Sequence, residues 1–115
     1  MTALDVISRV DGKMHNVFTR EDKLLWLNQL EKMASQLLAR CGRKEPWESV
    51  TEETALSIPE PFASLYDRWL EAQMHYANQE YLKFNNAMAL FQSLWQEYAN
   101  TLRRENPGTG RRNFF

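Results

Sequence analysis

The stretch of sequence that decides the fold is residues 81–102, which read YLKFNNAMALFQSLWQEYANTL. Large apolar side chains recur along it at alternating intervals of three and four residues, the spacing that keeps side chains on one face of an α-helix. The members of this series are Tyr81, Phe84, Met88, Phe91, Trp95, Tyr98 and Leu102. At 1.5 Å per residue, the predicted helix is about 33 Å long. This series is the strongest helical signal in the chain.

The segment before it predicts a partner helix. Pro61 suits the first turn of that helix, and Asn78 suits a break and the N-cap of the next helix. The apolar face carries Phe62, Leu65, Tyr66, Trp69, Ala72 and Tyr76. Because almost no loop separates the two helices, we expect an antiparallel hairpin with aromatic side chains along its seam. The expected core of this hairpin consists of Phe62, Tyr66, Trp69, Tyr76, Tyr81, Phe84, Phe91, Trp95 and Tyr98.

Two more helices are predicted nearer the N-terminus. The first is short and spans residues 2–10, with Thr2 as its N-cap and Asp11-Gly12 as its stop. The second starts after the N-cap Thr19 and ends at Gly42, and its apolar face carries Leu27, Leu30, Ala34, Leu37 and Cys41. The expected fold is therefore mainly α, a small helical bundle of about four helices that ends in the long C-terminal antiparallel hairpin.

The remaining segments are predicted to be irregular. Residues 43–60 lack helical periodicity and are rich in proline and glutamate, and short extended pieces at residues 47–50 and 55–58 could pair as a short β-hairpin. After Glu105, the sequence NPGTG at residues 106–110 breaks the helix, and RRNFF follows at residues 111–115. We therefore expect a helical domain at residues 1–105 and a flexible basic and aromatic C-terminal tail at residues 106–115.

Charge and composition argue against several classes of protein. The 115 residues carry a net charge of −1, whereas a generic nucleic-acid binder has a clear basic excess. Residues 1–100 hold 10 basic and 14 acidic side chains, and residues 101–115 hold 4 basic and 1 acidic side chain, so the C-terminal end is basic.

Cys41 is the single cysteine, which excludes an internal disulfide. The sequence shows no export signal and no apolar run long enough to span a bilayer, so we expect no membrane contact and synthesis in a cytoplasm.

Motifs that would indicate catalysis are not found in the sequence. A phosphate-binding loop, a nucleophile elbow and a zinc-protease helix are all missing. Glu71 and His75 have i, i+4 spacing with Glu80 nearby, but a metal site needs more converging ligands, and we interpret them as a surface ion pair. Cys41 is interpreted as a small buried side chain rather than a nucleophile. We therefore expect that the protein is not an enzyme and needs no cofactor. We expect no catalytic, cofactor-binding or metal-binding residue in it.

Two groups of residues point to partners. Trp26 and Trp47 fall outside the apolar stripes, and each either covers the core or belongs to a subunit interface, an alternative that the sequence leaves open. The C-terminal end offers a docking group for a partner protein that consists of Arg103, Arg104, Arg111, Arg112, Phe114 and Phe115. Its alternatives are a solvated tail, in which the first two arginines offset a helix dipole, and direct contact with DNA phosphates.

Several segments follow one another in a recognisable order. Near the N-terminus stand LDVISRVD at residues 4–11 and TREDKLLWL at residues 19–27. Further on come IPEPF at 58–62, LY at 65–66, WLEAQ at 69–73, YAN at 76–78, EY at 80–81 and KFNNAM at 83–88. In order and spacing, these segments resemble the small head-tail connector proteins of tailed bacteriophages and Gram-positive prophages. The resemblance covers most of the chain outside the acidic loop and the tail.

The resemblance implies a helical adaptor that assembles as a dodecameric ring beneath the portal in the neck of the virion. Such a ring prolongs the DNA channel, through which viral DNA passes without sequence recognition, and offers a surface to the next neck or tail component. In that family the C-terminal segment reaches into the portal, a role that residues 103–115 would have here. The chain departs from the family in its compact acidic loop, for which an acidic channel wall that does not hold phosphates is our hypothesis.

A rival interpretation comes from another class of protein. A small helical phage regulator or DNA-binding accessory protein would use residues 81–102 as a dimerisation helix. A concentration-dependent dimer that binds duplex DNA and does not bind the portal would favour this rival.

A third interpretation is a metal-dependent enzyme that uses Glu71 and His75, and it predicts stoichiometric bound metal.

Overall fold

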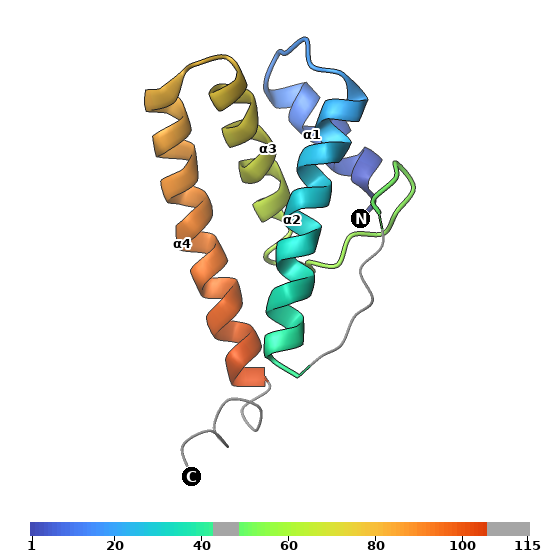
Figure 1. The fold of residues 1–115 in the computed structure, drawn as a ribbon, viewed down its shortest axis with the longest axis vertical. Helices are drawn as coiled ribbons and strands as arrows, with labels where there is room; N and C mark the ends of the chain where they lie inside the picture. The colour runs from blue at the N-terminus through green and yellow to red at the C-terminus, as the bar shows by residue number, and fades with distance from the viewer. Residues whose placement is uncertain (43–48, 106–115) are drawn as a thin grey trace.

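The computed structural model describes residues 1–42 and 49–105, and these ranges contain four helices. They are α1 (Ala3–Lys13), α2 (Arg20–Arg40), α3 (Ser64–Ala77) and α4 (Tyr81–Glu105). In Figure 1, α3 lies between α2 and α4 and runs antiparallel to both, while α1 packs against α2 and α3. The molecule measures 52 × 31 × 20 Å along its principal axes. The predicted mainly helical bundle with a long C-terminal antiparallel hairpin is confirmed.

The start of α1 is held by a capping box. Thr2 Oγ1 accepts a hydrogen bond from the Asp5 N–H at 3.2 Å, and Asp5 Oδ2 accepts one from the Thr2 N–H at 3.0 Å. These bonds lower the pKa of the Asp5 carboxyl group, because they favour its charged form. The predicted N-cap is therefore confirmed, and the helix continues through the predicted stop at Gly12 as far as Lys13.

The ends of α2 also follow local signals. Thr19 Oγ1 accepts a hydrogen bond from the Asp22 N–H at 3.1 Å, so this residue is the N-cap that the sequence predicts. Gly42 has a φ of 83°, the left-handed conformation that commonly follows the last turn of a helix. Between these ends, the predicted apolar face is buried, and its members are Leu27, Leu30, Ala34, Leu37 and Cys41.

The start of α3 differs from the prediction. Pro61 was expected in the first helical turn, but the helix begins at Ser64, after a tight turn. In this turn the Phe62 N–H donates to the Pro59 carbonyl at 2.9 Å, and the Leu65 N–H donates to the Phe62 carbonyl at 3.0 Å. These bonds span three residues instead of four, which is the geometry of a turn rather than of an α-helix.

The turn between α3 and α4 ends one helix before it starts the next. Asn78 is the C-cap of α3, so its predicted role as the N-cap of the following helix is wrong. The Glu80 N–H donates to the His75 carbonyl at 2.8 Å, and the Gln79 N–H donates to the Tyr76 carbonyl at 3.0 Å. This pair of bonds is a Schellman motif, which requires a left-handed residue, and Gln79 supplies it with a φ of 62°.

The segment before α3 is attached to the start of α1. The N–H groups of Ala3 and Leu4 donate to the carbonyls of Thr54 and Glu52 at 3.2 and 3.0 Å, which gives partners to donors that a helix start leaves unpaired. Ala55 forms an isolated antiparallel bridge with Thr2. The described residues contain no strand, so residues 55–58 do not form the predicted β-hairpin, and Trp47 and Glu48 of its other half lie outside the described ranges.

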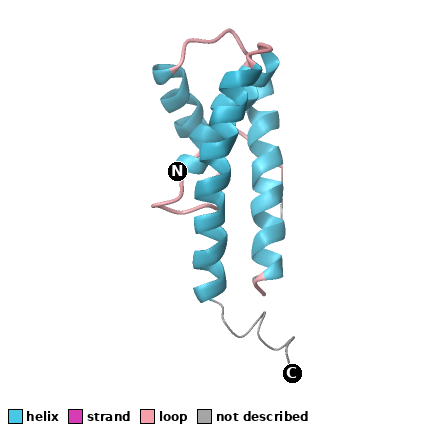
Figure 2. Cartoon of the chain, turned by 90° about the vertical axis from the view of Figure 1, so that its left-hand side faces the viewer, coloured by secondary structure: helices cyan, strands magenta, loops and turns pink. Residues whose placement is uncertain are grey.

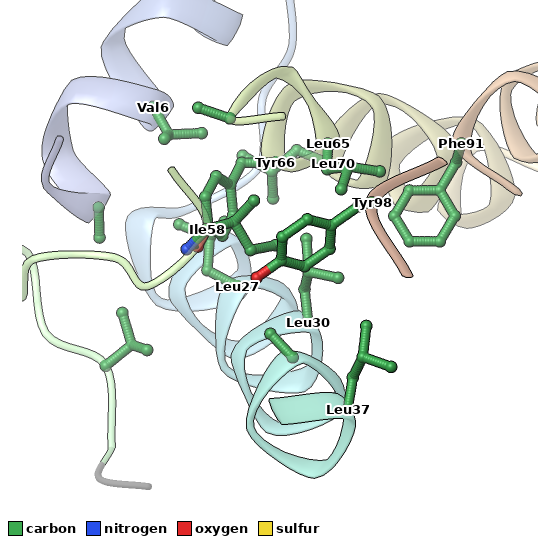
Figure 3. Packing of buried hydrophobic residues seen from close by; sticks show 14 of the residues in the cluster. Val6, Leu27, Leu30, Leu37, Ile58, Leu65, Tyr66, Leu70, Phe91 and Tyr98 are labelled. Carbon is green, nitrogen blue, oxygen red and sulfur yellow. Dashed lines mark hydrogen bonds between the residues drawn. The ribbon is translucent and has the colours of Figure 1, made fainter. Parts of the chain in front are cut away.

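One hydrophobic core joins the four helices. Figure 3 shows Leu27, Leu30 and Leu37 of α2, Leu65, Tyr66 and Leu70 of α3, and Phe91 and Tyr98 of α4 converging on it. The hairpin seam is aromatic, with ring centroids 5.1 Å apart for Trp69 and Phe91 and 5.3 Å apart for Phe62 and Tyr98. Each such pair is worth about 0.5–1.5 kcal/mol beyond the area that it buries.

Two residues predicted in the hairpin core lie at the surface. Tyr76 and Tyr81 are 54% and 52% exposed. They stand on either side of the α3–α4 turn, where their rings pack on each other with centroids 5.6 Å apart, and the Tyr76 ring also packs on Phe84, which is half-buried. The seam is therefore buried towards the C-terminal half of α4 and open at the turn.

Ion pairs fix the position of α1. Asp67 of α3 is buried and accepts hydrogen bonds from Arg9 Nε at 2.8 Å, Arg9 Nη2 at 2.6 Å and Lys13 Nζ at 3.0 Å. The hydrogen bonds to Asp67 raise the pKa of the Arg9 guanidinium group. Lys23 of α2 is also buried, and it donates to Asp11 Oδ1 at 2.8 Å. Because a buried charge without its partner is strongly destabilising, α1 is held in one place on the bundle.

The left-handed conformation of Gln79 generates a prediction. Replacement of Gln79 by glycine should raise the free energy of unfolding by about 0.5–1 kcal/mol, because glycine adopts this conformation without a steric cost. The matched control is Asn78→Gly, whose φ of −85° gives glycine no advantage, so this variant should lose stability. Urea denaturation of the three proteins measures both changes. Equal effects of the two substitutions would contradict the assignment of the Schellman motif.

Candidate functional site

Potential metal ligands do not converge in the described part of the chain. Residues 1–42 and 49–105 contain no group of three or more His, Cys, Asp or Glu side chains placed to hold a metal ion. His75 pairs across the α3–α4 turn, with its Nδ1 atom 3.1 Å from Glu80 Oε1, and Lys83 Nζ lies 3.2 Å from Glu80 Oε2. The hydrogen bonds from His75 and then Lys83 lower the pKa of the Glu80 carboxyl group. We expected His75 to pair with Glu71, but its partner in the structure is Glu80.

A buried polar cluster joins α2, α3 and the segment between them. Glu31 of α2 accepts hydrogen bonds from the Tyr66 hydroxyl group and from Ser57 Oγ, the latter at 2.8 Å. The Tyr66 oxygen in turn accepts one from the Ile58 N–H at 2.7 Å. Burial and the Glu31 carboxylate raise the pKa of the Tyr66 hydroxyl group well above its ordinary value. The cluster holds the segment around Ile58 against the core.

Glu31 is not among the residues that the sequence pattern singled out. Its position was nevertheless a signal, since it follows Leu30 directly and lies four residues after Leu27 and three before Ala34, all of them fully buried. At 100° per residue this spacing places Glu31 on the apolar face. A carboxylate on an apolar face must find hydrogen-bond donors, and here Tyr66 and Ser57 provide them.

A pocket of about 380 Å³ opens beside this cluster. Its walls come from the C-terminal part of α2, the segment before α3 and the C-terminal part of α4. The lining residues include two aromatic rings, Phe62 and Tyr98, and two carboxylates, Glu60 and Glu105. The sequence could not reveal this pocket, because residues more than 60 positions apart form it, as Leu38 and Leu102 do.

The outer face of α4 is exposed, and it is uncharged between Lys83 and Glu97. No ionisable side chain occurs in the 13 residues 84–96, between Lys83 and Glu97. We define the neutral face of α4 by its exposed members, which are Leu82, Asn85, Asn86, Ala89, Leu90, Gln92, Ser93 and Gln96. Two apolar side chains stand out on it, Leu82 at 77% and Leu90 at 56% exposure. Figure 2, which is turned so that the α4 side faces the viewer, shows this helix in front.

The residues predicted to contact partners are only partly placed. Trp26 is half-buried, with its ring edge-on to Phe18 at a centroid distance of 5.3 Å, and its carbonyl accepts a hydrogen bond from Trp69 Nε1 at 2.7 Å. Its ring therefore covers the core, and part of it stays accessible. Arg103 and Arg104 are exposed in the last turn of α4 and donate to Asn100 and Thr101. The other predicted contacts, Trp47, Arg111, Arg112, Phe114 and Phe115, lie outside the described residues.

The acidic loop is also placed in part. Glu45 and Glu48 lie outside the described ranges, whereas Glu52 and Glu53 precede the bridge at Ala55. Glu52 Oε2 lies 3.1 Å from Arg20 Nη1, so one of the acidic side chains is paired.

Comparisons with known proteins give no relative for this chain: no protein-family model, no curated protein and no solved structure matches it. Of the helices in residues 1–42 and 49–105, none is both long and apolar enough to cross a bilayer.

The buried hydroxyl group of Tyr66 generates a prediction about pH. Loss of this group in Tyr66→Phe should cost about 1–3 kcal/mol at pH 7, because the Ile58 N–H and Glu31 each lose a buried partner. In the folded protein the pKa of Tyr66 is raised, so the unfolded chain releases this proton near pH 10 while the folded chain keeps it. The contribution is therefore complete below pH 10 and falls above it, by up to about 1.4 kcal/mol per pH unit.

Urea denaturation between pH 8 and pH 11 tests this prediction. The difference in unfolding free energy between wild type and Tyr66→Phe should stay constant up to about pH 10 and shrink above it. Tyr76→Phe is the control, since its exposed ring should make loss of the hydroxyl group nearly neutral at pH 7. A difference that does not change up to pH 11 would count against a buried, protonated Tyr66.

Proposed function

We propose that this protein is a non-catalytic structural subunit that assembles with copies of itself into a ring, as the head-tail connector of a tailed bacteriophage or prophage. The observation that carries this proposal is the neutral face of α4, an exposed helical surface without charge. The composition of this face supports its role in assembly. The resemblance along the sequence supports the place of the protein in a virion.

The absence of charged residues on the neutral face is unusual for a solvent-exposed surface. A quarter of all residues in the chain are charged, yet 13 consecutive residues of its longest helix are not. The solvent side of a helix normally carries charged residues, whereas the centres of protein interfaces are depleted in them. Leu82 and Leu90 add apolar area two helical turns apart. An uncharged face can also approach a second copy of the same protein without electrostatic repulsion.

The resemblance supplies the biological context of the proposal. It implies a dodecameric ring, so we propose a dodecamer beneath the portal that prolongs the DNA channel and joins the head to the next neck or tail component. The protein would be made in the cytoplasm of the host bacterium and would act in the neck of the virion. Viral DNA would pass it without sequence recognition, and no cofactor would be needed.

The dimeric regulator remains the alternative function, but the structure makes its proposed dimerisation helix less suitable. The series from Tyr81 to Leu102 would have to face a second subunit, whereas Phe91, Tyr98 and Leu102 are buried in the core of the same chain. A regulator would therefore have to dimerise through another surface. Binding of duplex DNA by a dimer that does not bind the portal protein would support this alternative.

A charge on the neutral face should prevent assembly. We expect Leu90→Glu to lower the yield of rings by about tenfold or more, because each subunit contact would bury an unpaired carboxylate. The matched control is Leu25→Glu on α2, since both leucines are 56% exposed. Electron microscopy of each protein mixed with the portal protein from the same genome, with native mass spectrometry, measures the rings. Rings from Leu90→Glu at the wild-type yield would contradict the proposed interface.

The C-terminal tail should contribute to attachment. Removal of residues 106–115 should leave the helices folded, because the described core lies within residues 3–102, and should weaken binding to the portal by about tenfold or more. Circular dichroism measures the helix content, and surface-immobilised portal measures the affinity. Replacement of the same ten residues by a glycine–serine segment of equal length controls for chain length. Unchanged affinity of the truncated protein would refute a role of the tail in docking.

A further inference from the structure

The pocket between the ends of α2 and α4 has the chemistry of a site for a basic and aromatic peptide. Glu60 and Glu105 supply two carboxylates, and neither forms an ion pair with another described residue. Arg9 lies close enough to Glu60 for the charges to interact, but its guanidinium group is bound to Asp67 through two hydrogen bonds. The carboxylates of the pocket are therefore available to other cations.

The walls between the carboxylates suit flat side chains. Phe62 and Tyr98 contribute rings whose centroids are 5.3 Å apart, and Pro59 and Pro61 add rigid apolar surface. Aromatic rings attract guanidinium groups over their faces and phenylalanine rings at their edges. A volume of about 380 Å³ accommodates a few side chains rather than a whole helix. The expected ligand is thus a short segment that carries arginine next to an aromatic residue.

The chain itself contains such a segment, a few residues after a residue that lines the pocket. Glu105 lines the pocket, and residues 111–115 read RRNFF, with two arginines for two carboxylates and two phenylalanines for the apolar walls. Five residues separate Glu105 from Arg111, and the six Cα–Cα steps between them span about 20 Å when extended. The Pro107-Gly108 pair between them is typical of a chain reversal, which is what a return along α4 requires.

We propose that this pocket binds the Arg111–Phe115 segment of the same chain. Covalent attachment raises the effective concentration of the segment at the pocket to the millimolar range, so that even a weak contact is occupied. The inference does not depend on the ring. Where the segment also docks on the portal, the two contacts compete, and the portal must first displace the segment from the pocket.

Disulfide trapping in the full-length protein tests the proposal. Cys41 is replaced by alanine, and the pair Thr101→Cys with Asn113→Cys joins the pocket wall to the segment. The control pair is Arg103→Cys with Asn113→Cys, because Arg103 is exposed and projects from the other side of α4 although it is nearer in sequence. We expect the first pair to form an intramolecular disulfide at least about tenfold faster than the control pair, as judged by mass spectrometry and non-reducing electrophoresis.

Charge reversal shows whether the pocket attracts the segment. Glu60→Lys with Glu105→Lys should abolish the difference in rate between the two pairs, and adding Arg111→Glu with Arg112→Glu should restore it. Circular dichroism checks that every variant keeps its helices. Equal rates for the two cysteine pairs, or a product that consists only of covalent dimers, would overturn the proposal. Its failure would leave the ring untouched, since Leu90→Glu tests a different face of α4.

Discussion

The hydroxyl group of Tyr66 donates a hydrogen bond to Glu31 and accepts one from the Ile58 N–H, and the arrangement of the bundle depends on this contact. It is buried, and it joins α2, α3 and the segment that leads into α3 at one point. Apolar packing alone tolerates small shifts of one helix along another, whereas a buried carboxylate must keep its donors. The register of α3 against α2 is therefore set by a polar contact inside an apolar core.

The next residue of α3, Asp67, makes a second buried polar contact, with α1. Asp67 is buried and paired with Arg9 and Lys13, so α1 is attached to α3 through one carboxylate. The segment before α3 is in turn attached to the first residues of α1 through backbone hydrogen bonds. Because Tyr66 and Asp67 are adjacent in sequence, a single helical turn fixes α1, α2 and the wall of the pocket relative to one another. The pocket is thus a consequence of how the core is aligned.

The sequence predicted those features that depend on neighbours in the chain. The capping residues Thr2 and Thr19 and the apolar series of α4 are local patterns, and such patterns favour a helix without reference to distant residues. Features that depend on distant residues were not predictable from spacing. Burial of Glu31 requires knowledge that Tyr66 faces it. Exposure of Tyr81 requires knowledge that none of the four described helices covers the turn end of the hairpin. The pocket combines both difficulties, since three separate segments build it.

The two sides of α4 can serve different purposes because they are chemically separate. Its buried side carries the aromatic seam and, near Tyr98 and Glu105, one wall of the pocket, while its neutral face points away from the core. A mutation on the neutral face should therefore change stability little, so folding places little constraint on which residues occur there. Exposed positions without such constraint usually carry charge, because charge keeps proteins soluble and apart. Folding thus does not require the absence of charge over more than three helical turns, whereas the proposed ring contact would account for it.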